Sequence, residues 1–255
     1  MTVFGSYARY YDLLYRDKDY VAEVDFIASL LQKHAPHGKD ILELGCGTGA
    51  HASLLAARGF TLHGVDMSDE MLLAAFDRSL NLPPELRDRL SFSQGNARNC
   101  RIGREFDSVL SLFHVVSYQT TNEQLHAMFE TAALHLKAGG VFIFDYWYGP
   151  TVLTERPSVR VKRIESKEIG VTRIAEPIIL VTESCVDVNY HVYIEDLVTH
   201  EVDQLHETHR MRYLFATEIK MLARTAGLEV MESCEWLSGR QPGLNTWGVC
   251  SVLRK

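Results

Sequence analysis

Residues 40–50 read D-I-L-E-L-G-C-G-T-G-A, and this stretch decides the fold. Its first half is a short apolar run, which predicts a strand buried on both faces. Its second half carries three glycines at alternate positions: Gly45, Gly47 and Gly49. A helical pattern follows over residues 51–58. A strand, a glycine loop and a helix in this order bring bare backbone and a helix N-terminus close to a ligand.

A carboxylate lies one strand further along the chain. Asp66 follows a second strand-like run over residues 61–65. A carboxylate at this position can accept hydrogen bonds from both ribose hydroxyls of a nucleoside. The unit over residues 41–66 therefore predicts a site for a nucleoside cofactor.

The glycine pattern leaves more than one class of cofactor open. Gly45, Gly47 and Ala50 satisfy G-x-G-x-x-G/A, which is typical of dinucleotide sites. Glu43 and the third glycine extend the pattern to E-x-G-x-G-x-G, which resembles the first motif of class I S-adenosylmethionine-dependent methyltransferases. That cofactor has no pyrophosphate, so an acidic residue beside the loop is tolerable. We favour S-adenosyl-L-methionine over a dinucleotide, and over a loop that only packs.

Composition narrows the class of protein further. The chain has 255 residues, 46% hydrophobic and 23% charged, enough for one large domain or one domain with an insertion. Its net charge of −7 argues against nucleic acid or an anionic membrane as a partner. The five cysteines are widely spaced and fit reduced thiols. There is no signal-peptide pattern and no apolar run long enough for a membrane span. We expect a cytoplasmic protein and leave a homodimer open.

The resemblance to class I methyltransferases covers nearly the whole chain and implies a Rossmann-like α/β fold with a mostly parallel seven-stranded sheet. Residues 134–145, which contain L-K-A-G-G-V-F-I-F-D, resemble the entry to the fifth strand of that family. Between residues 150 and 213 the helical periodicity disappears, and runs rich in Val, Ile, Thr and Tyr predict an inserted antiparallel sheet. We expect a cofactor-binding core over residues 1–149 and 214–255, and an inserted subdomain over 150–213 that covers the substrate site.

The resemblance also implies which residues contact the cofactor. Met67 would lie against the adenine ring and Asp66 against the ribose. Asn96 occupies a position where the family usually has an acidic residue facing the adenine amine, but it still offers a carbonyl acceptor. The full set of expected cofactor contacts is Tyr11, Glu43, Gly45, Cys46, Gly47, Gly49, Asp66, Met67, Asn96, Ala97 and Leu112.

Aromatic residues and a histidine are expected to surround the methyl acceptor. Residues 10–15 read Y-Y-D-L-L-Y, which resembles an N-terminal segment of small-molecule methyltransferases, notably those acting on amino sugars. By that resemblance Tyr11 and Tyr15 face the cofactor or substrate, although a packing role remains open. Ligands of open α/β sheets bind at the carboxyl ends of the strands. His114 and Tyr118 should therefore lie on the rim, together with the segment 145–148, which supplies Trp147 and Tyr148.

These assignments predict methyl transfer to a small molecule, most simply to an amine of a sugar or sugar nucleotide in a biosynthetic pathway. His114, Tyr118 and Tyr11 are the expected catalytic residues, with His114 and Tyr118 able to accept or relay the proton of an amine. An O-methyltransferase with His114 as base is one alternative, and a non-catalytic module that senses the cofactor is another.

Charged residues in the predicted insertion bear on the substrate. Six basic side chains against four glutamates over residues 151–176 suggest an anionic substrate such as a nucleotide sugar, although a solvated strand edge also explains them. His206 and His209 would point to opposite faces of a strand, so we expect no metal site there.

Overall fold

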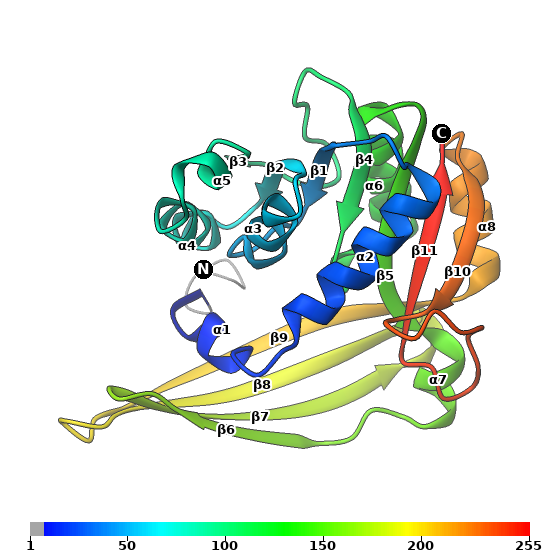
Figure 1. Ribbon diagram of the computed structural model, residues 1–255. Coiled ribbons are helices and arrows are strands. Elements are labelled where there is room, and N and C mark those ends of the chain that lie inside the picture. Colours follow the sequence, from blue (N-terminus) through cyan, green and yellow to red (C-terminus); the bar gives the residue numbers. More distant parts are fainter. Residues whose placement is uncertain (1–7) are drawn as a thin grey trace.

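The computed structural model describes residues 8–255, and residues 1–7 of the predicted core segment lie outside the described residues. The chain forms an α/β core with a long antiparallel sheet lying across one end of it (Figure 1). The helices have the following bounds: α1 Ala8–Leu14, α2 Tyr20–His34, α3 Ala50–Ala57, α4 Asp69–Leu80, α5 Pro84–Arg87, η1 Val115–Tyr118, α6 Asn122–His135, α7 Gly149–Thr154, η2 Val181–Glu183 and α8 Ala216–Thr225.

The core sheet is mostly parallel. Its strands within the described residues are β1 Asp40–Leu44, β2 Thr61–Asp66, β3 Leu90–Gln94, β4 Phe106–Ser111, β5 Leu136–Tyr148, β10 Glu229–Glu235 and β11 Gly248–Arg254. They lie in the order β3-β2-β1-β4-β5-β11-β10, and β11 runs antiparallel between β5 and β10. The predicted α/β fold with a mostly parallel core sheet is confirmed.

The strand region before α8 is the predicted antiparallel sheet. Its strands are β6 Arg160–Glu165, β7 Ile169–Leu180, β8 Cys185–Asp196 and β9 Val202–Leu214, each antiparallel to the next. The longest strands of this sheet include β7, which runs without a break through Pro177. Pro177 does not interrupt this strand because the β6 pairing already ends at Ala175, so the missing proline N–H meets no ladder partner on that side.

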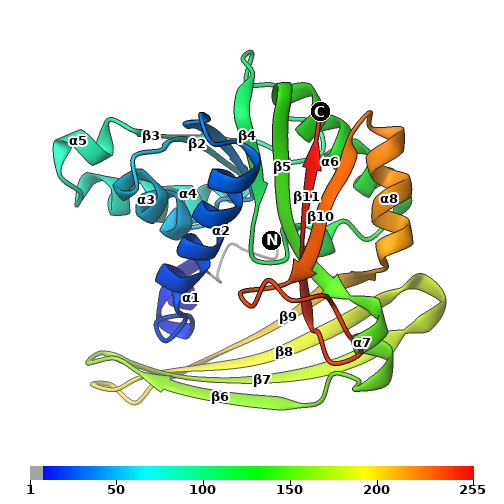
Figure 2. The ribbon, with the colours of Figure 1, turned by 45° about the vertical axis from the view of Figure 1, so that its right-hand side comes forward.

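The two sheets are joined at one short contact. The end of β5 pairs in parallel with the end of β9, with Trp147 opposite Tyr213 and Tyr148 opposite Leu214. Figures 1 and 2 show the β6–β9 sheet extending from this junction beneath the core. The carboxyl ends of the parallel strands therefore face the inner surface of the second sheet.

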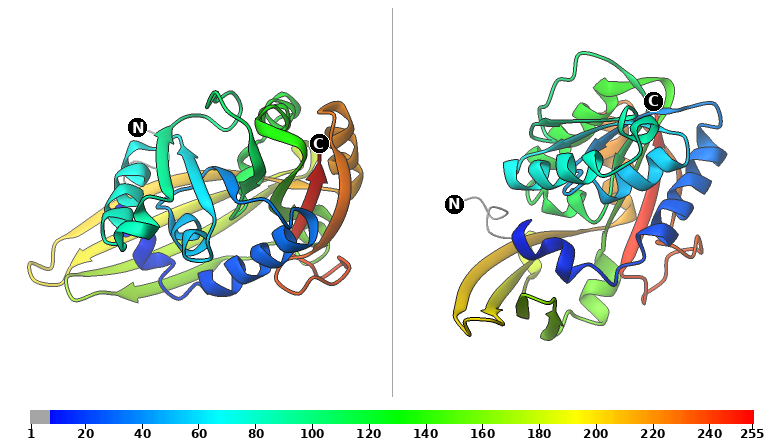
Figure 3. Two further views of the ribbon diagram at one scale, coloured as in Figure 1. Left: turned by 45° about the horizontal axis from the view of Figure 1, so that its top comes forward. Right: turned by 60° about the vertical axis from the view of Figure 1, so that its left-hand side comes forward.

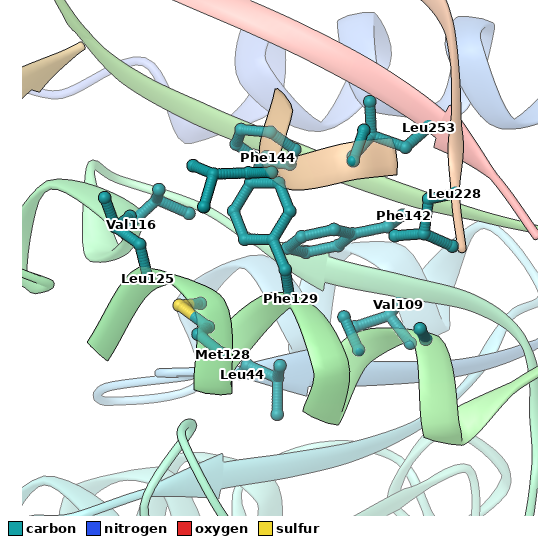
Figure 4. Packing of buried hydrophobic residues seen from close by; sticks show 14 of the residues in the cluster. Leu44, Val109, Val116, Leu125, Met128, Phe129, Phe142, Phe144, Leu228 and Leu253 are labelled. Carbon is teal, nitrogen blue, oxygen red and sulfur yellow. The ribbon is translucent and has the colours of Figure 1, made fainter. Parts of the chain in front are cut away.

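Helices cover both faces of the core sheet. On one face, α6 and α8 pack on β4, β5 and β11, and the Phe129 ring stands edge-on to Phe142 and Phe144 at centroid distances of 5.5 and 5.2 Å (Figure 4). On the other face, α2 and α3 bury Val24, Ile27 and Leu55 against the strands. This double cover explains why the core strands read as continuous apolar runs.

The N-terminal helix links the core to the second sheet. Tyr10 and Leu14 of α1 are fully buried and share a cluster with Met71 of α4, Ile164 of β6 and Val171 of β7. Figure 3 shows α1 between the core helices and the β6–β9 sheet. None of the helices in residues 8–255 is long and apolar enough to cross a membrane.

Candidate active site

A cavity of about 1180 Å³ opens where the carboxyl ends of the core strands face the second sheet. This exceeds the roughly 300–1,000 Å³ typical of small-molecule sites, so there is room for a cofactor together with a substrate. Most residues expected at the site line this cavity: Tyr11, Tyr15, Gly45, Cys46, Gly47, Asp66, Met67, Asn96, Ala97, Leu112, His114, Tyr118 and Trp147.

The glycine loop and Asp66 form one hydrogen-bonded unit. Gly45 and Gly47 have φ angles of +79° and +53°, which residues with side chains rarely adopt. The Gly47 N–H donates to Asp66 Oδ2 at 2.8 Å, and the Ser68 N–H donates to Oδ1 at 2.9 Å. Burial raises the pKa of Asp66, and these N–H donors oppose the shift. Each carboxylate oxygen keeps acceptor capacity for a ribose hydroxyl.

His114 lies on a strained turn directly after β4. Both Phe113 and His114 have φ of +63°. The His114 N–H donates to both oxygens of Asp145 at 3.2 and 3.1 Å, and its Nδ1 lies 2.7 Å from Asp145 Oδ2 without the alignment of a hydrogen bond. Asp145 is 1% exposed, so it orients His114 from below and does not face the cavity. The hydrogen bonds to the buried Asp145 carboxylate stabilise this strained backbone conformation, and such strained positions are common at functional sites.

The opposite wall of the cavity is basic. Arg160 and Lys162 of β6 and Arg173 of β7 all line it. Residues 160 and 162 are two positions apart and Lys162 pairs with Arg173, so the three side chains share the inner face of the sheet. The Arg173 guanidinium donates to Tyr15 Oη at 3.2 Å and lies 4.7 Å from the Tyr190 ring centre.

The comparisons with known proteins agree with this geometry. The sequence profile of a family described as a methyltransferase domain matches residues 41–140. The dTDP-3-amino-3,4,6-trideoxy-alpha-D-glucopyranose N,N-dimethyltransferase of Streptomyces venezuelae is 35% identical over 152 residues, which span 59% of this chain and 61% of that relative. The chain is an S-adenosylmethionine-dependent methyltransferase, and its residues 41–140 match the methyltransferase domain.

Two further matches cover more of this methyltransferase. The dTDP-3-amino-3,6-dideoxy-alpha-D-glucopyranose N,N-dimethyltransferase of Streptomyces fradiae is 28% identical, over 89% of this chain and 85% of the relative. The crystal structure of DesVI from Streptomyces venezuelae superposes with a TM-score of 0.78 at 26% identity, covering 96% of this chain and 97% of that chain. The second sheet is included in this likeness, because so little of the chain lies outside the alignment.

The methyl donor of this methyltransferase is S-adenosylmethionine. The residues that line the cavity are compatible with this cofactor. Gly47 adopts a left-handed conformation with no atom within 4 Å of where a Cβ would stand, so the loop leaves open space beside Asp66. Met67 is 53% exposed at the cavity, which leaves its side chain free to cover a ring.

Three residues expected to contact a ligand lie outside the cavity lining. Gly49 begins α3 with a φ of +71°, and a Cβ there would come within 3.1 Å of the Phe92 ring, so this glycine serves packing. Tyr148 packs against the core cluster because its neighbour Trp147 takes the cavity side of β5. Glu43, the third, is 1% exposed beneath the loop. Tyr146, expected on the rim with segment 145–148, is fully buried in the core.

Glu43 is a buried acid in this methyltransferase. Burial raises its pKa to about 8, and the nearby Asp66 carboxylate adds to the shift. Its Oε2 has no hydrogen-bond partner, and its Oε1 lies 3.9 Å from His51 Nδ1. The other ring nitrogen of His51 lies 2.7 Å from Glu23, which also pairs with Lys18. At neutral pH Glu43 is therefore mostly protonated.

Several groups at the site were not found by sequence reasoning. These are Lys18, Glu23 and His51 beneath the loop, Glu207 and His209 behind Tyr118, and Tyr20, Tyr190, Trp236 and Trp247 in the lining. They come from separate segments, and no local motif marks them. Within residues 8–255, no group of three or more His, Cys, Asp or Glu side chains is arranged to hold a metal ion.

Replacing Asp66 should weaken cofactor binding. Asp66→Asn keeps the size of the side chain but removes the charge and one acceptor, so affinity for S-adenosylmethionine should fall by about 1–3 kcal/mol. Isothermal titration with S-adenosylmethionine and S-adenosylhomocysteine measures the change. Asp69→Asn, on the exposed first turn of α4, is the control. Equal affinity in the Asp66 variant and the wild type would remove this carboxylate from the cofactor site.

The buried acid should make stability depend on pH. A carboxyl whose folded-state pKa is raised contributes stability that is complete below about pH 4.5 and is lost as the pH rises through about 8. Glu43→Gln lacks this titration, so the free energy of unfolding of the wild type should fall relative to the variant by several kcal/mol between these limits. Urea unfolding at pH 5 and pH 8.5 tests this, with the exposed Glu85→Gln as control. Parallel pH courses for Glu43→Gln and the wild type would contradict a raised pKa.

Proposed function

We propose that this methyltransferase methylates an amine on a nucleotide-linked sugar. The observation that carries the proposal is the basic wall of Arg160, Lys162 and Arg173, which faces the same cavity as the Asp66 loop. Guanidinium and ammonium groups on one face of a sheet suit a diphosphate. The printed names of the relatives from both Streptomyces species, N,N-dimethyltransferases of dTDP-linked amino sugars, support the same class of substrate.

The residues of the loop would hold the cofactor. Gly45, Cys46 and Gly47 approach with backbone, Asp66 accepts from the ribose, and Met67, Asn96, Ala97 and Leu112 surround the base. When bound, S-adenosylmethionine supplies an electrophilic methyl group on a sulfonium. The chain contributes alignment and exclusion of water, which together account for much of the rate of such displacements.

The aromatic side of the cavity would close over the acceptor. The rings of Tyr11 and Tyr15 lie 4.7 Å apart, and Tyr15 meets Phe113 edge-on at 5.0 Å. Trp147 meets His114 edge-on at 6.3 Å. We propose that residues 150–213 act as a subdomain that covers this chamber.

We also propose that the enzyme is cytoplasmic. Whether it forms a homodimer is a question for a measurement of its mass in solution.

The acceptor amine must be neutral when it attacks, so a group at the site must take its proton. His114, oriented by Asp145, and Tyr118 on the adjoining turn η1 both line the cavity and can do this. The His114–Asp145 pair would also suit a hydroxyl acceptor, because a histidine backed by a carboxylate is a strong general base. O-methylation of a sugar is therefore the second candidate.

A panel of acceptors separates these functions. Titration with S-adenosylmethionine should show binding, and methyl transfer should occur with nucleotide-linked amino sugars but not with the matching 3-hydroxy or 4-hydroxy sugars. Turnover of the hydroxy compounds alone would favour the O-methyltransferase. Cofactor binding without turnover over the whole panel would favour a sensing module.

Removing one charge from the basic wall should weaken binding of the nucleotide. Arg160→Gln should raise the KM for a nucleotide-linked acceptor about fivefold, since a solvent-exposed contact to phosphate contributes roughly 1 kcal/mol. Its kcat and its affinity for S-adenosylmethionine should not change. Arg163→Gln is the matched control, because Arg163 lies on the same strand but on the outer face. If both variants kept the wild-type KM, the phosphate assignment would be wrong.

A further inference from the structure

Tyr118 is connected to a buried histidine on the second sheet. Its hydroxyl lies 2.8 Å from His209 Nδ1, and His209 Nε2 lies 3.3 Å from Glu207 Oε2. His209 is 2% exposed, and neither it nor Glu207 lines the cavity. Tyr118 does line the cavity, so it can connect these two residues of β9 to a substrate.

Other titratable and charged groups surround this pair. The Tyr190 ring of β8 stands edge-on to His209 at 4.9 Å, and the guanidinium of Arg173 from β7 lies over Tyr190. On the side of α1, burial and then the Glu207 carboxylate raise the pKa of Tyr10. Burial raises the pKa of Tyr118 well above its usual range, so its hydroxyl stays protonated.

The positions of the protons follow from this chain of contacts. A carboxylate only accepts hydrogen bonds, so Glu207 fixes the proton of neutral His209 on Nε2. The Nδ1 atom then holds a lone pair and accepts from the Tyr118 hydroxyl. A hydroxyl that donates its proton still carries acceptor lone pairs, so Tyr118 Oη can donate to His209 and accept from a group in the cavity.

We propose that His209 and Glu207 are positioning residues that enable Tyr118 to take the proton of the acceptor amine. The proposal rests on the proposed function, because only an acceptor that arrives as an ammonium needs such a path. In the step, an N–H bond of the ammonium breaks and its proton goes to Tyr118 Oη. The original Tyr118 proton goes to His209 Nδ1, and the electron pair of the broken bond stays on the amine nitrogen.

This step needs no unstable tyrosinate. Tyr118 gives one proton and gains one, so it is neutral throughout. The positive charge moves from the substrate to His209, where it lies beside Glu207. The oxygen of a neutral phenol is a poor base when it acts alone, which is why a partner that takes the phenol proton at the same time matters.

The test compares two histidines of the same strand. His209→Gln removes the nitrogen that accepts the proton of Tyr118, and kcat for the amine at pH 7 should fall about 10–100-fold while the affinity for S-adenosylmethionine is unchanged. The loss should shrink as the pH approaches about 9, because the amine then arrives neutral. The control is His206→Gln, because His206 is exposed on the outer face of β9. A loss that is the same at every pH, or no loss, would overturn the relay.

Glu207→Gln provides a second variant in case His209→Gln does not fold. It should show the same pH-dependent loss, because it removes the charge that favours a protonated His209. A wild-type rate at pH 7 in a folded Glu207→Gln variant would count against the relay.

A second measurement judges the relay without turnover. Nitrogen-15 NMR of the wild type at neutral pH should show His209 protonated on Nε2 and not on Nδ1, and Tyr118→Phe should shift the Nδ1 resonance. A proton on Nδ1 would overturn the relay whatever the substrate. If the wild type methylated no amine, the proposed function would fail, and the NMR result would still decide the proton positions.

Discussion

The hydrogen bond from the Gly47 N–H to the Asp66 carboxylate is the contact on which the site depends. It joins the loop after β1 to the end of β2, and the same carboxylate accepts from the Ser68 N–H at the start of α4. Glycine takes the left-handed conformation of Gly45 and Gly47 without the strain that a side chain would add. Loop, carboxylate and helix start are therefore placed together, and one side of the cavity is fixed by the core alone.

The other side depends on how the second sheet is attached. The β5–β9 pairing is only two residue pairs long, so it cannot by itself fix the sheet along its length. The buried cluster around Tyr10 and Leu14 of α1 holds the far end, and the Tyr118–His209 hydrogen bond holds the middle. Because the sheet is fixed at three places, one of its faces is held against the cavity. Arg160, Lys162 and Arg173 occupy alternate positions of β6 and β7 on that face, so their side chains line the cavity.

The parts of the structure that the sequence predicts are those with local causes. The glycine loop and the apolar strands each follow from a few neighbouring residues. The roles of Asp145 and His209 do not, because each depends on a partner more than 30 residues or a whole sheet away. Glu43 was assigned to the ligand by its motif. The structure instead buries it beside His51, because helices cover both faces of β1. Sequence spacing shows which strand end a residue occupies, but packing decides its face.

Charge is distributed unevenly along the cavity, and this bears on which molecule fits it. Asp66 lines the cofactor end, and Asp145 lies under His114 beside it, whereas Arg160, Lys162 and Arg173 line the end at β6 and β7. An ammonium is favoured near buried carboxylates and a phosphate near guanidinium groups, and the low dielectric of the cavity strengthens both preferences. A molecule with an amine at one end and a diphosphate at the other would be bound in one orientation, with its amine toward His114 and Tyr118. A sugar without phosphates would lack this constraint. The charges that line the cavity therefore favour the nucleotide-linked amino sugar that we propose as the substrate over a free sugar.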